Sequence, residues 1–127
     1  MNHPNTFRKE ERISLQTEID ALFTEGKSFV SYPLRIIYLR RRPASGERVS
    51  ILISVPKKRL KRAVKRNRIK RLIREAYRKN KSELAMLPAV QQSGLLISFI
   101  FLGNVPSTYS AIETSIKHAF IELATCL

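Results

Sequence analysis

The chain has 127 residues, of which 43% are hydrophobic, and a formal net charge of +14 from 24 Lys and Arg against 10 Asp and Glu. This length suits one folded domain over residues 1–127, and the apolar content excludes an intrinsically disordered chain. No run of about 18 apolar residues could span a membrane and no signal peptide is visible, so we expect a cytoplasmic protein without a membrane partner. The charge exceeds what solubility requires and indicates a polyanionic partner, which nucleic acid fits best.

The first predicted elements are an arm and a helix. Residues 1–12 are mostly polar and are expected to be a flexible or partly ordered arm. Ser14 is a candidate N-cap and Gly26 a candidate C-cap of the helix that follows. Its apolar residues recur at helical spacing, at Leu15, Ile19, Leu22 and Phe23.

Strands are predicted in three segments. Residues 29–39 favour one or two strands, interrupted near Pro33 because proline has no N–H for a central ladder. Residues 40–48 are rich in turn residues and predict a loop, whereas residues 49–55 alternate with the period of a strand. The nearly continuous apolar run at residues 95–102 is typical of a strand covered on both faces.

A final amphipathic helix is predicted after this strand. Ser107 is its candidate N-cap. One apolar face of the helix is formed by Tyr109, Ile112, Ile116, Ala119, Phe120 and Leu123.

Residues 57–81 concentrate the positive charge of the chain. They contain 14 Lys or Arg, opposed locally only by Glu75 and the nearby Glu83. Apolar residues within this run follow one helical stripe, consisting of Ile69, Leu72, Ile73, Ala76 and Tyr77, whereas residues 60–64 leave open whether a loop or a first turn precedes it. Opposite the stripe lie Asn67, Lys70, Arg71, Arg74 and Arg78, flanked by Arg66 and Arg68.

A charged helix face is ordinarily a solvated surface, but here the charges have one sign. Like charges three or four residues apart repel by a few tenths of a kcal/mol per pair, so phosphates would stabilise this face. Asn67 is the uncharged exception, suited to a base edge, a 2′-hydroxyl or a hydrated metal ion; a local cap near the helix start is the alternative.

The string from Ala63 to Arg78, with Lys57 and Lys58 before it, resembles the signature of the ribonuclease P protein family. The similarity includes the Arg-Asn-Arg sequence at residues 66–68 and the surrounding order of elements over nearly the whole chain. It implies an α/β two-layer sandwich in the order α-β-β-β-α-β-α. The basic helix would form a left-handed βαβ crossover, which is an exception to the usual rule.

The resemblance also implies a function. In this family the protein joins a catalytic RNA subunit, and the ribonucleoprotein removes the 5′ leader of precursor transfer RNA (tRNA) with Mg²⁺ bound mainly by RNA. The expected partners are therefore the catalytic RNA and precursor tRNA, with no obligate protein partner. The expected RNA-binding residues are Lys57, Lys58, Lys65, Arg66, Asn67, Arg68, Lys70, Arg71, Arg74 and Arg78.

A cleft between the sheet and the first helix is implied for the leader. Its expected lining residues are Phe23, Ile19 and Ile37, although many family members carry aromatic residues at the positions of Ile19 and Ile37. Phe23 could stack on a base or belong to the core. Phe7 and Tyr38 could replace the missing aromatics, but alternation places Tyr38 on the sheet face opposite Ile37.

The residues themselves do not indicate a nuclease that acts alone. The acids are scattered, the two histidines lack the spacing of a helical metal pair, and the lone Cys126 excludes an internal disulfide, so we predict no catalytic residue and no metal held by protein ligands alone. Asn67 could assist a metal indirectly. The alternatives are a ribosomal-type structural RNA-binding protein and, less favoured, a module that places residues 65–78 in a DNA major groove.

Overall fold

The computed structural model describes residues 12–13 and 15–127. Its elements are α1 (Gln16–Glu25), β1 (Lys27–Ser31), β2 (Leu34–Leu39), β3 (Val49–Ser54), α2 (Ala63–Ala85), α3 (Pro88–Ser93), β4 (Leu95–Phe101) and α4 (Tyr109–Cys126). The predicted α/β class and order of elements are confirmed, with the short α3 added between α2 and β4. The predicted arm lies outside the described residues, apart from Arg12.

The four strands form one sheet in the order β1-β2-β4-β3. β2 pairs antiparallel with both β1 and β4, whereas β3 and β4 are parallel. At the β3 edge, the Ile13 N–H donates to the Ile51 carbonyl over 2.8 Å, and Arg12 forms an isolated parallel bridge with Ile51. β4 therefore has a neighbour on each side, which fits its nearly continuous apolar sequence.

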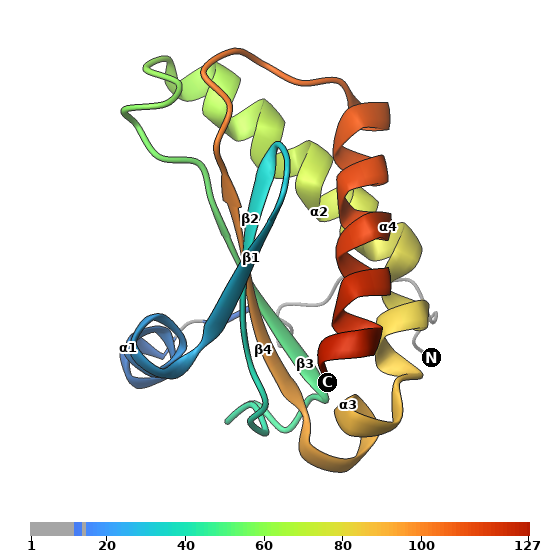
Figure 1. Cartoon of the computed structure of the whole chain (residues 1–127). Helices are drawn as coiled ribbons and strands as arrows, with labels where there is room; N and C mark the ends of the chain where they lie inside the picture. Colours follow the sequence, from blue (N-terminus) through green and yellow to red (C-terminus); the bar gives the residue numbers. More distant parts are fainter. Residues whose placement is uncertain (1–11, 14) are drawn as a thin grey trace, which may run out of the picture.

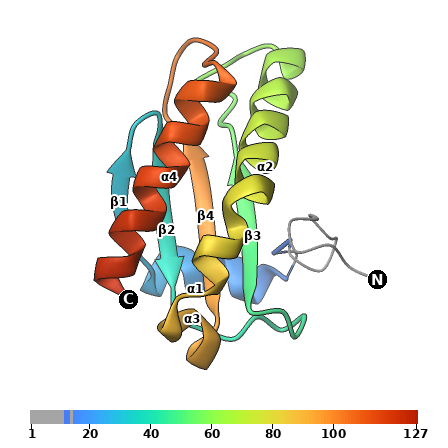
Figure 2. The same cartoon turned by 90° about the vertical axis from the view of Figure 1, so that its right-hand side faces the viewer.

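The connection from β3 to β4 through α2 is left-handed. In Figure 2 both strands run upward, α2 descends in front of the sheet, and β4 lies to the left of β3. A right-handed connection over this face would place β4 on the right. The handedness implied by the resemblance is thus confirmed.

The two faces of the sheet are covered unequally. Figure 1 shows α2 and α4 on one face and α1 on the other, near one end of the strands. The α2/α4 face holds the main core, in which the Tyr77 ring lies 6.1 Å from the Phe99 ring and 6.4 Å from the Phe120 ring between centroids. The α1 face holds a smaller cluster, consisting of Ile13, Leu22 and Leu96 with the partly buried Ile19, Ile37, Leu39 and Leu52.

The helix ends differ in part from the predictions. Gly26 is confirmed as the C-cap of α1, and its N–H donates to the Leu22 carbonyl, whereas the predicted N-cap Ser14 lies outside the described residues. Ser107 is wrong as the cap of α4. The adjacent Thr108 accepts from the Ala111 N–H over 3.2 Å, because Thr108 is the residue directly before the first helical position.

The missed helix α3 begins at Pro88 and ends before Gly94. Gly94 has φ +76°, and a Cβ there would lie 2.9 Å from the Arg42 Cα. Only glycine combines this backbone conformation with such a close approach. Gly94 thus places the chain for its entry into β4, against the 40–48 loop.

Candidate nucleic-acid interface

The basic helix α2 packs on the sheet through the predicted stripe. Ile69, Ile73, Ala76 and Tyr77 are fully or almost fully buried, and Leu72 is half-buried. α2 begins at Ala63, so the segment before it is a loop, and Val64 in the first turn is 80% exposed. Because the stripe fixes the rotation of the helix, the cations on its other side face outward.

Six of the predicted RNA-binding cations have no partner among the described residues. They make no hydrogen bond or ion pair with any residue that the structure describes; they are Lys57, Lys58, Lys65, Arg68, Lys70 and Arg71. Lys70 is half-buried and the other five are exposed. Uncompensated cations this close together repel one another, and an anion on this surface would relieve the repulsion.

Two other predicted cations, Arg66 and Arg78, are partly engaged within the protein. Arg66 donates from Nη1 to the carbonyls of Leu60 (2.9 Å) and Lys61 (2.7 Å), which ties the loop before α2 to the helix. Arg78 forms an ion pair with Glu75, with Nη2 2.5 Å from Oε1 and Nε 3.1 Å from Oε2. These two arginines therefore shape the surface as well as contribute charge to it.

Arg74 lies beside the β3 edge. It lines a recess with Arg12, Ile13, Ile51, Leu52 and Ile53. Burial lowers the pKa of Arg74, and the neighbouring charges of Arg12 and Arg71 lower it further. The cationic surface of α2 therefore continues to the edge of the sheet.

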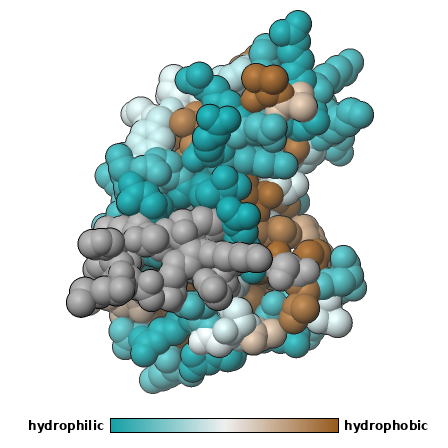
Figure 3. All heavy atoms as spheres, turned by 180° about the vertical axis from the view of Figure 1, so that it is seen from behind, coloured by the Kyte–Doolittle hydropathy of each residue, from teal (hydrophilic) through white to brown (hydrophobic). Residues whose placement is uncertain are grey.

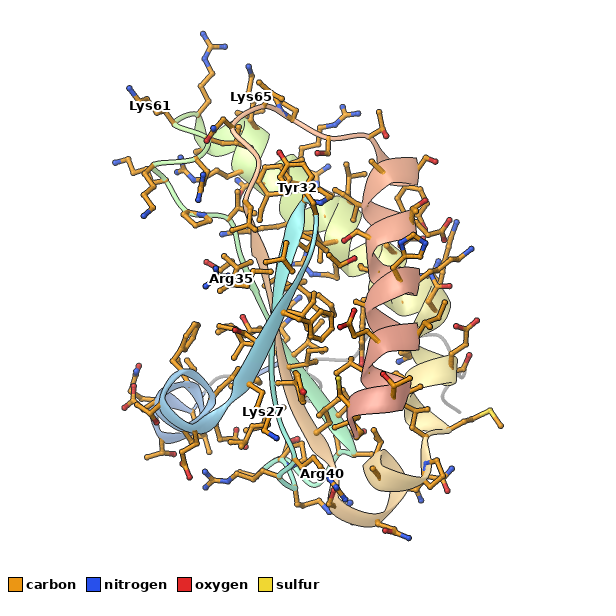
Figure 4. All side chains as sticks on the ribbon, viewed as in Figure 1. Lys27, Tyr32, Arg35, Arg40, Lys61 and Lys65 are labelled. Atoms are coloured by element: carbon orange, nitrogen blue, oxygen red, sulfur yellow. The ribbon has the colours of Figure 1, made fainter. Side chains whose placement is uncertain are left out.

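Sequence reasoning missed three cations in the loop before α2. Arg59, Lys61 and Arg62 line a recess together with Lys58 and Lys65, closed on its other side by residues 104–106. Arg59 Nη1 lies 3.5 Å from Asn104 Oδ1, and Figure 4 shows Lys61 and Lys65 at this end of the molecule. The high density of Lys and Arg was the available signal, but the loop has no periodicity from which to assign a face.

Asn67 is exposed on α2 and makes no hydrogen bond to a described residue. The N-cap position belongs to Arg62, five residues earlier, which has no side-chain cap. The alternative of a local capping role for Asn67 is therefore wrong. Its amide faces outward among the cations of the helix.

The predicted cleft residues lie together on the α1 face. Ile19 and Ile37 are half-buried in the small cluster under α1, whereas Phe23 is 49% exposed and is not a core residue. Tyr38 lies on the other face, as alternation predicted, with its ring 6.0 Å from Phe29. Phe7 lies outside the described residues.

The α1 face is open at the end farthest from α1. Its last row crosses all four strands in register, from Val30 through Arg35 and Ile100 to Ser54. Val30 and Arg35 are exposed, and Ile100 and Ser54 are half-buried. In Figure 3 the outline is hollowed beside a patch of hydrophobic residues, with hydrophilic side chains above and below it. We refer to Val30, Arg35, Ile100 and Ser54 as the open row.

Several acids of the chain take part in the fold. Glu18 accepts from the Ala44 N–H over 2.9 Å, Glu75 binds Arg78, and Glu113 accepts from Tyr109 and Asn80. In residues 12–13 and 15–127, no three His, Cys, Asp or Glu side chains gather as a metal site would require. No helix in the described part of the chain is long and apolar enough to cross a membrane.

A left-handed βαβ unit whose helix carries outward cations defines a nucleic-acid-binding protein of the α/β class. The Ribonuclease P family model matches residues 7–123. The chain therefore belongs to the ribonuclease P protein family. It is the protein component of an endoribonuclease whose other component is an RNA subunit and which acts in tRNA processing.

Relatives and solved structures agree with this assignment. The chain is 43% identical over 129 residues to the ribonuclease P protein component of Porphyromonas gingivalis strain W83, covering 98% of this chain and 92% of the relative. The Staphylococcus aureus RNase P protein structure matches with a TM-score of 0.70 at 25% identity, covering 90% and 94% of the two chains. The Thermotoga maritima protein, at 22% identity and a TM-score of 0.68, supports the fold alone and covers 88% and 96% of the two chains.

Proposed function

We propose that this protein binds the catalytic RNA through one continuous basic surface. This surface consists of Lys57, Lys58, Arg59, Lys61, Arg62, Lys65, Arg68, Lys70 and Arg71. The observation that carries the proposal is that the apolar stripe of α2 is buried while its cations point away from the core. Such an arrangement suits contacts with phosphates, which are independent of nucleotide sequence.

We further propose that precursor tRNA is the substrate and that its 5′ leader lies on the open part of the α1 face. Phe23 supports this proposal because its half-exposed ring is available for a base to stack on, a contact that contributes about 1 to 3 kcal/mol. Ile19 of α1 and Ile37 of β2 form the apolar side of the same region, where both pack against the small cluster between α1 and the sheet. Their role is to shape the surface, since neither side chain has a ring for stacking.

Hydrolysis is assigned to the RNA subunit, with Mg²⁺ held mainly by RNA. The protein offers cations and the outward amide of Asn67 at this surface, and Glu18, Glu75 and Glu113 are engaged in hydrogen bonds or ion pairs. Asn67 is proposed to retain a hydrated ion indirectly, through its amide oxygen. The protein then supplies binding and charge neutralisation rather than a catalytic group.

The test is cleavage of a precursor tRNA at low Mg²⁺ by the catalytic RNA of the same organism, with and without the protein, beside a protein-only control. We expect correct 5′ maturation only when both components are present. If about six cations meet phosphates, RNA affinity should fall by about three decades between about 50 and 200 mM salt. Binding without any gain in cleavage would instead indicate a structural RNA-binding protein.

A further inference from the structure

Arg35 is a cation within an otherwise uncharged strip of the sheet. Burial along β2 alternates, and Leu34, Ile36 and Tyr38 face the main core while Arg35 is exposed on the α1 face. Its cross-strand neighbours are Val30 on β1 and Ile100 on β4, and the row ends at Ser54 on β3. Figure 4 shows Arg35 projecting to the side of the sheet on which α1 lies, between α1 and the end of the molecule that carries Lys61.

Among the described residues, the Arg35 guanidinium has no partner. Arg35 makes no hydrogen bond or ion pair with any residue in the described ranges 12–13 and 15–127, and α1 covers the rows around Ile37 and Leu39 rather than the open row. Its neighbours in the row are two aliphatic side chains and one hydroxyl, none of which neutralises it. A lone cation on an apolar floor is suited to an anion that arrives from outside.

The open row also leads to the basic surface. Ser54 ends β3, and Lys57 follows three residues later, within about 10 Å of chain. Arg35 lies two strands away from Ser54, at about 10 Å across the sheet. A single strand that left the basic surface near Lys57 and crossed the row would therefore carry a phosphate past Arg35.

We infer that Arg35 binds a backbone phosphate of the 5′ leader of precursor tRNA where the leader crosses the open row. The inference rests on the proposed function and names a binding residue for it that the basic helix does not include. A phosphate is the ligand that fits, because the row offers a planar two-donor cation but no aromatic ring or amide to read a base. The contact is therefore independent of leader sequence but dependent on leader length.

The test compares Arg35→Gln and Arg35→Lys in the complex reconstituted with the catalytic RNA. The matched control is Lys27→Gln, an exposed cation of the same hairpin that alternation places on the α4 face. Affinity is measured for precursor tRNA with a leader of about ten nucleotides and for mature tRNA without a leader, at several salt concentrations. Thermal unfolding of each free protein verifies that the exposed substitutions leave the fold intact.

We expect R35Q to weaken precursor binding about 5- to 10-fold and leave mature tRNA unchanged, with the salt slope reduced by about 0.7 for one lost contact to a single strand. R35K should recover most of this loss because it keeps the charge, and K27Q should match the wild type. Equal affinity of R35Q and wild type for the precursor, or an equal loss for both RNAs, would overturn the inference alone. A wild-type protein that confers no preference for the precursor would overturn the proposed leader site as well.

Discussion

The two halves of α2 use the same residue types for different purposes. In the first half, Lys65, Arg68 and Arg71 are exposed and make no hydrogen bond or ion pair with a described residue. In the second half, Arg78 pairs with Glu75, and the Lys79 ammonium lies 5.4 Å from the centre of the Tyr109 ring. The acids and aromatics that α4 and α2 itself supply are confined to the second half. One end of the helix is therefore held by the fold and the other is left for a partner.

The largest expected effect comes from removing charge in the first half. The triple variant Lys65→Ala, Arg68→Ala and Arg71→Ala should weaken binding of the catalytic RNA by about 100-fold at low salt and reduce the salt slope by about 2 to 3. Alanine favours helix, so thermal stability should be unchanged or slightly higher. Filter binding over a salt series measures the effect.

A charge-matched control is available elsewhere on the molecule. Lys27, Lys79 and Lys117 are exposed cations outside the basic surface, and replacing all three by alanine removes the same net charge. RNA affinity should fall less than about 10-fold in this variant. If the two triple variants lost equal affinity, the total charge of the protein rather than the position of the cations in the first half of α2 would govern binding.

Substitution of Glu113 tests whether contacts with α4 hold the second half of α2 in the fold. It accepts hydrogen bonds from Tyr109 (3.0 Å) and from the buried Asn80 (3.3 Å), which joins α4 to α2. Glu113→Ala should lower the free energy of unfolding by about 1 to 2 kcal/mol, because Tyr109 loses its acceptor and Asn80 keeps only the Ala76 carbonyl. Urea unfolding measures the loss. Glu83→Ala is the same change at an exposed acid of α2 that makes no hydrogen bond or ion pair with a described residue, and it should cost much less.

The same residue predicts a pH dependence. The hydrogen bonds from Asn80 and Tyr109 lower the pKa of Glu113, and the bond from Arg78 lowers that of Glu75. A depressed folded pKa gives stability that is present above the unfolded value of about 4.3 and is lost as the pH falls through the folded value. Unfolding measured from pH 7 to pH 3 should therefore show a smaller drop in Glu113→Gln than in wild type, and parallel curves would contradict the assignment.

A medium effect on catalysis is expected at Asn67. Asn67→Ala should reduce cleavage about 10-fold at limiting Mg²⁺ and less than about 2-fold at saturating Mg²⁺, if the amide helps to retain a metal ion at the RNA. Cleavage rates over a Mg²⁺ titration measure this difference. Equal losses at both concentrations would assign Asn67 to RNA contact alone.

The smallest expected effect tests whether RNA contacts Arg78, in the second half of α2. Glu75→Gln removes the acid that pairs with Arg78 and so leaves its guanidinium available to RNA. We expect RNA affinity to rise about 2-fold, with only a small loss of stability, because both side chains of the ion pair are partly exposed, at 37% and 43%. An unchanged affinity would indicate that RNA does not reach the second half of α2.

The features that could be predicted from the sequence are those that depend on the periodicity of a single helix or strand. The stripe from Ile69 to Tyr77, the apolar run of β4 and the opposite faces of Ile37 and Tyr38 all follow from spacing within a strand or helix. The left-handed crossover came only from the family resemblance. α3 escaped prediction because six residues with Pro at the start are too few to show a helical period.

Roles that depend on contacts between segments could not be predicted. In the sequence, Arg66 is not distinguished from the other cations of the helix. Only the folded structure brings the carbonyls of Leu60 and Lys61 to its guanidinium. In the sequence, Arg35 is a polar residue of an alternating strand. Its exposure could not be predicted because it depends on how far α1 extends over the sheet. Thr108 and Ser107 are both good caps, and the position of the first helical turn decides between them.

The position of β4 between β2 and β3 constrains how the chain can fold during its synthesis. β4 is the last strand to be made, yet it pairs with Leu34–Leu39 on one side and with Val49–Ser54 on the other. Until residues 95–101 have left the ribosome, two apolar strands lack their common neighbour and expose unpaired edges. Such edges favour pairing with other chains, so this protein depends on completing its last third before it is protected from aggregation.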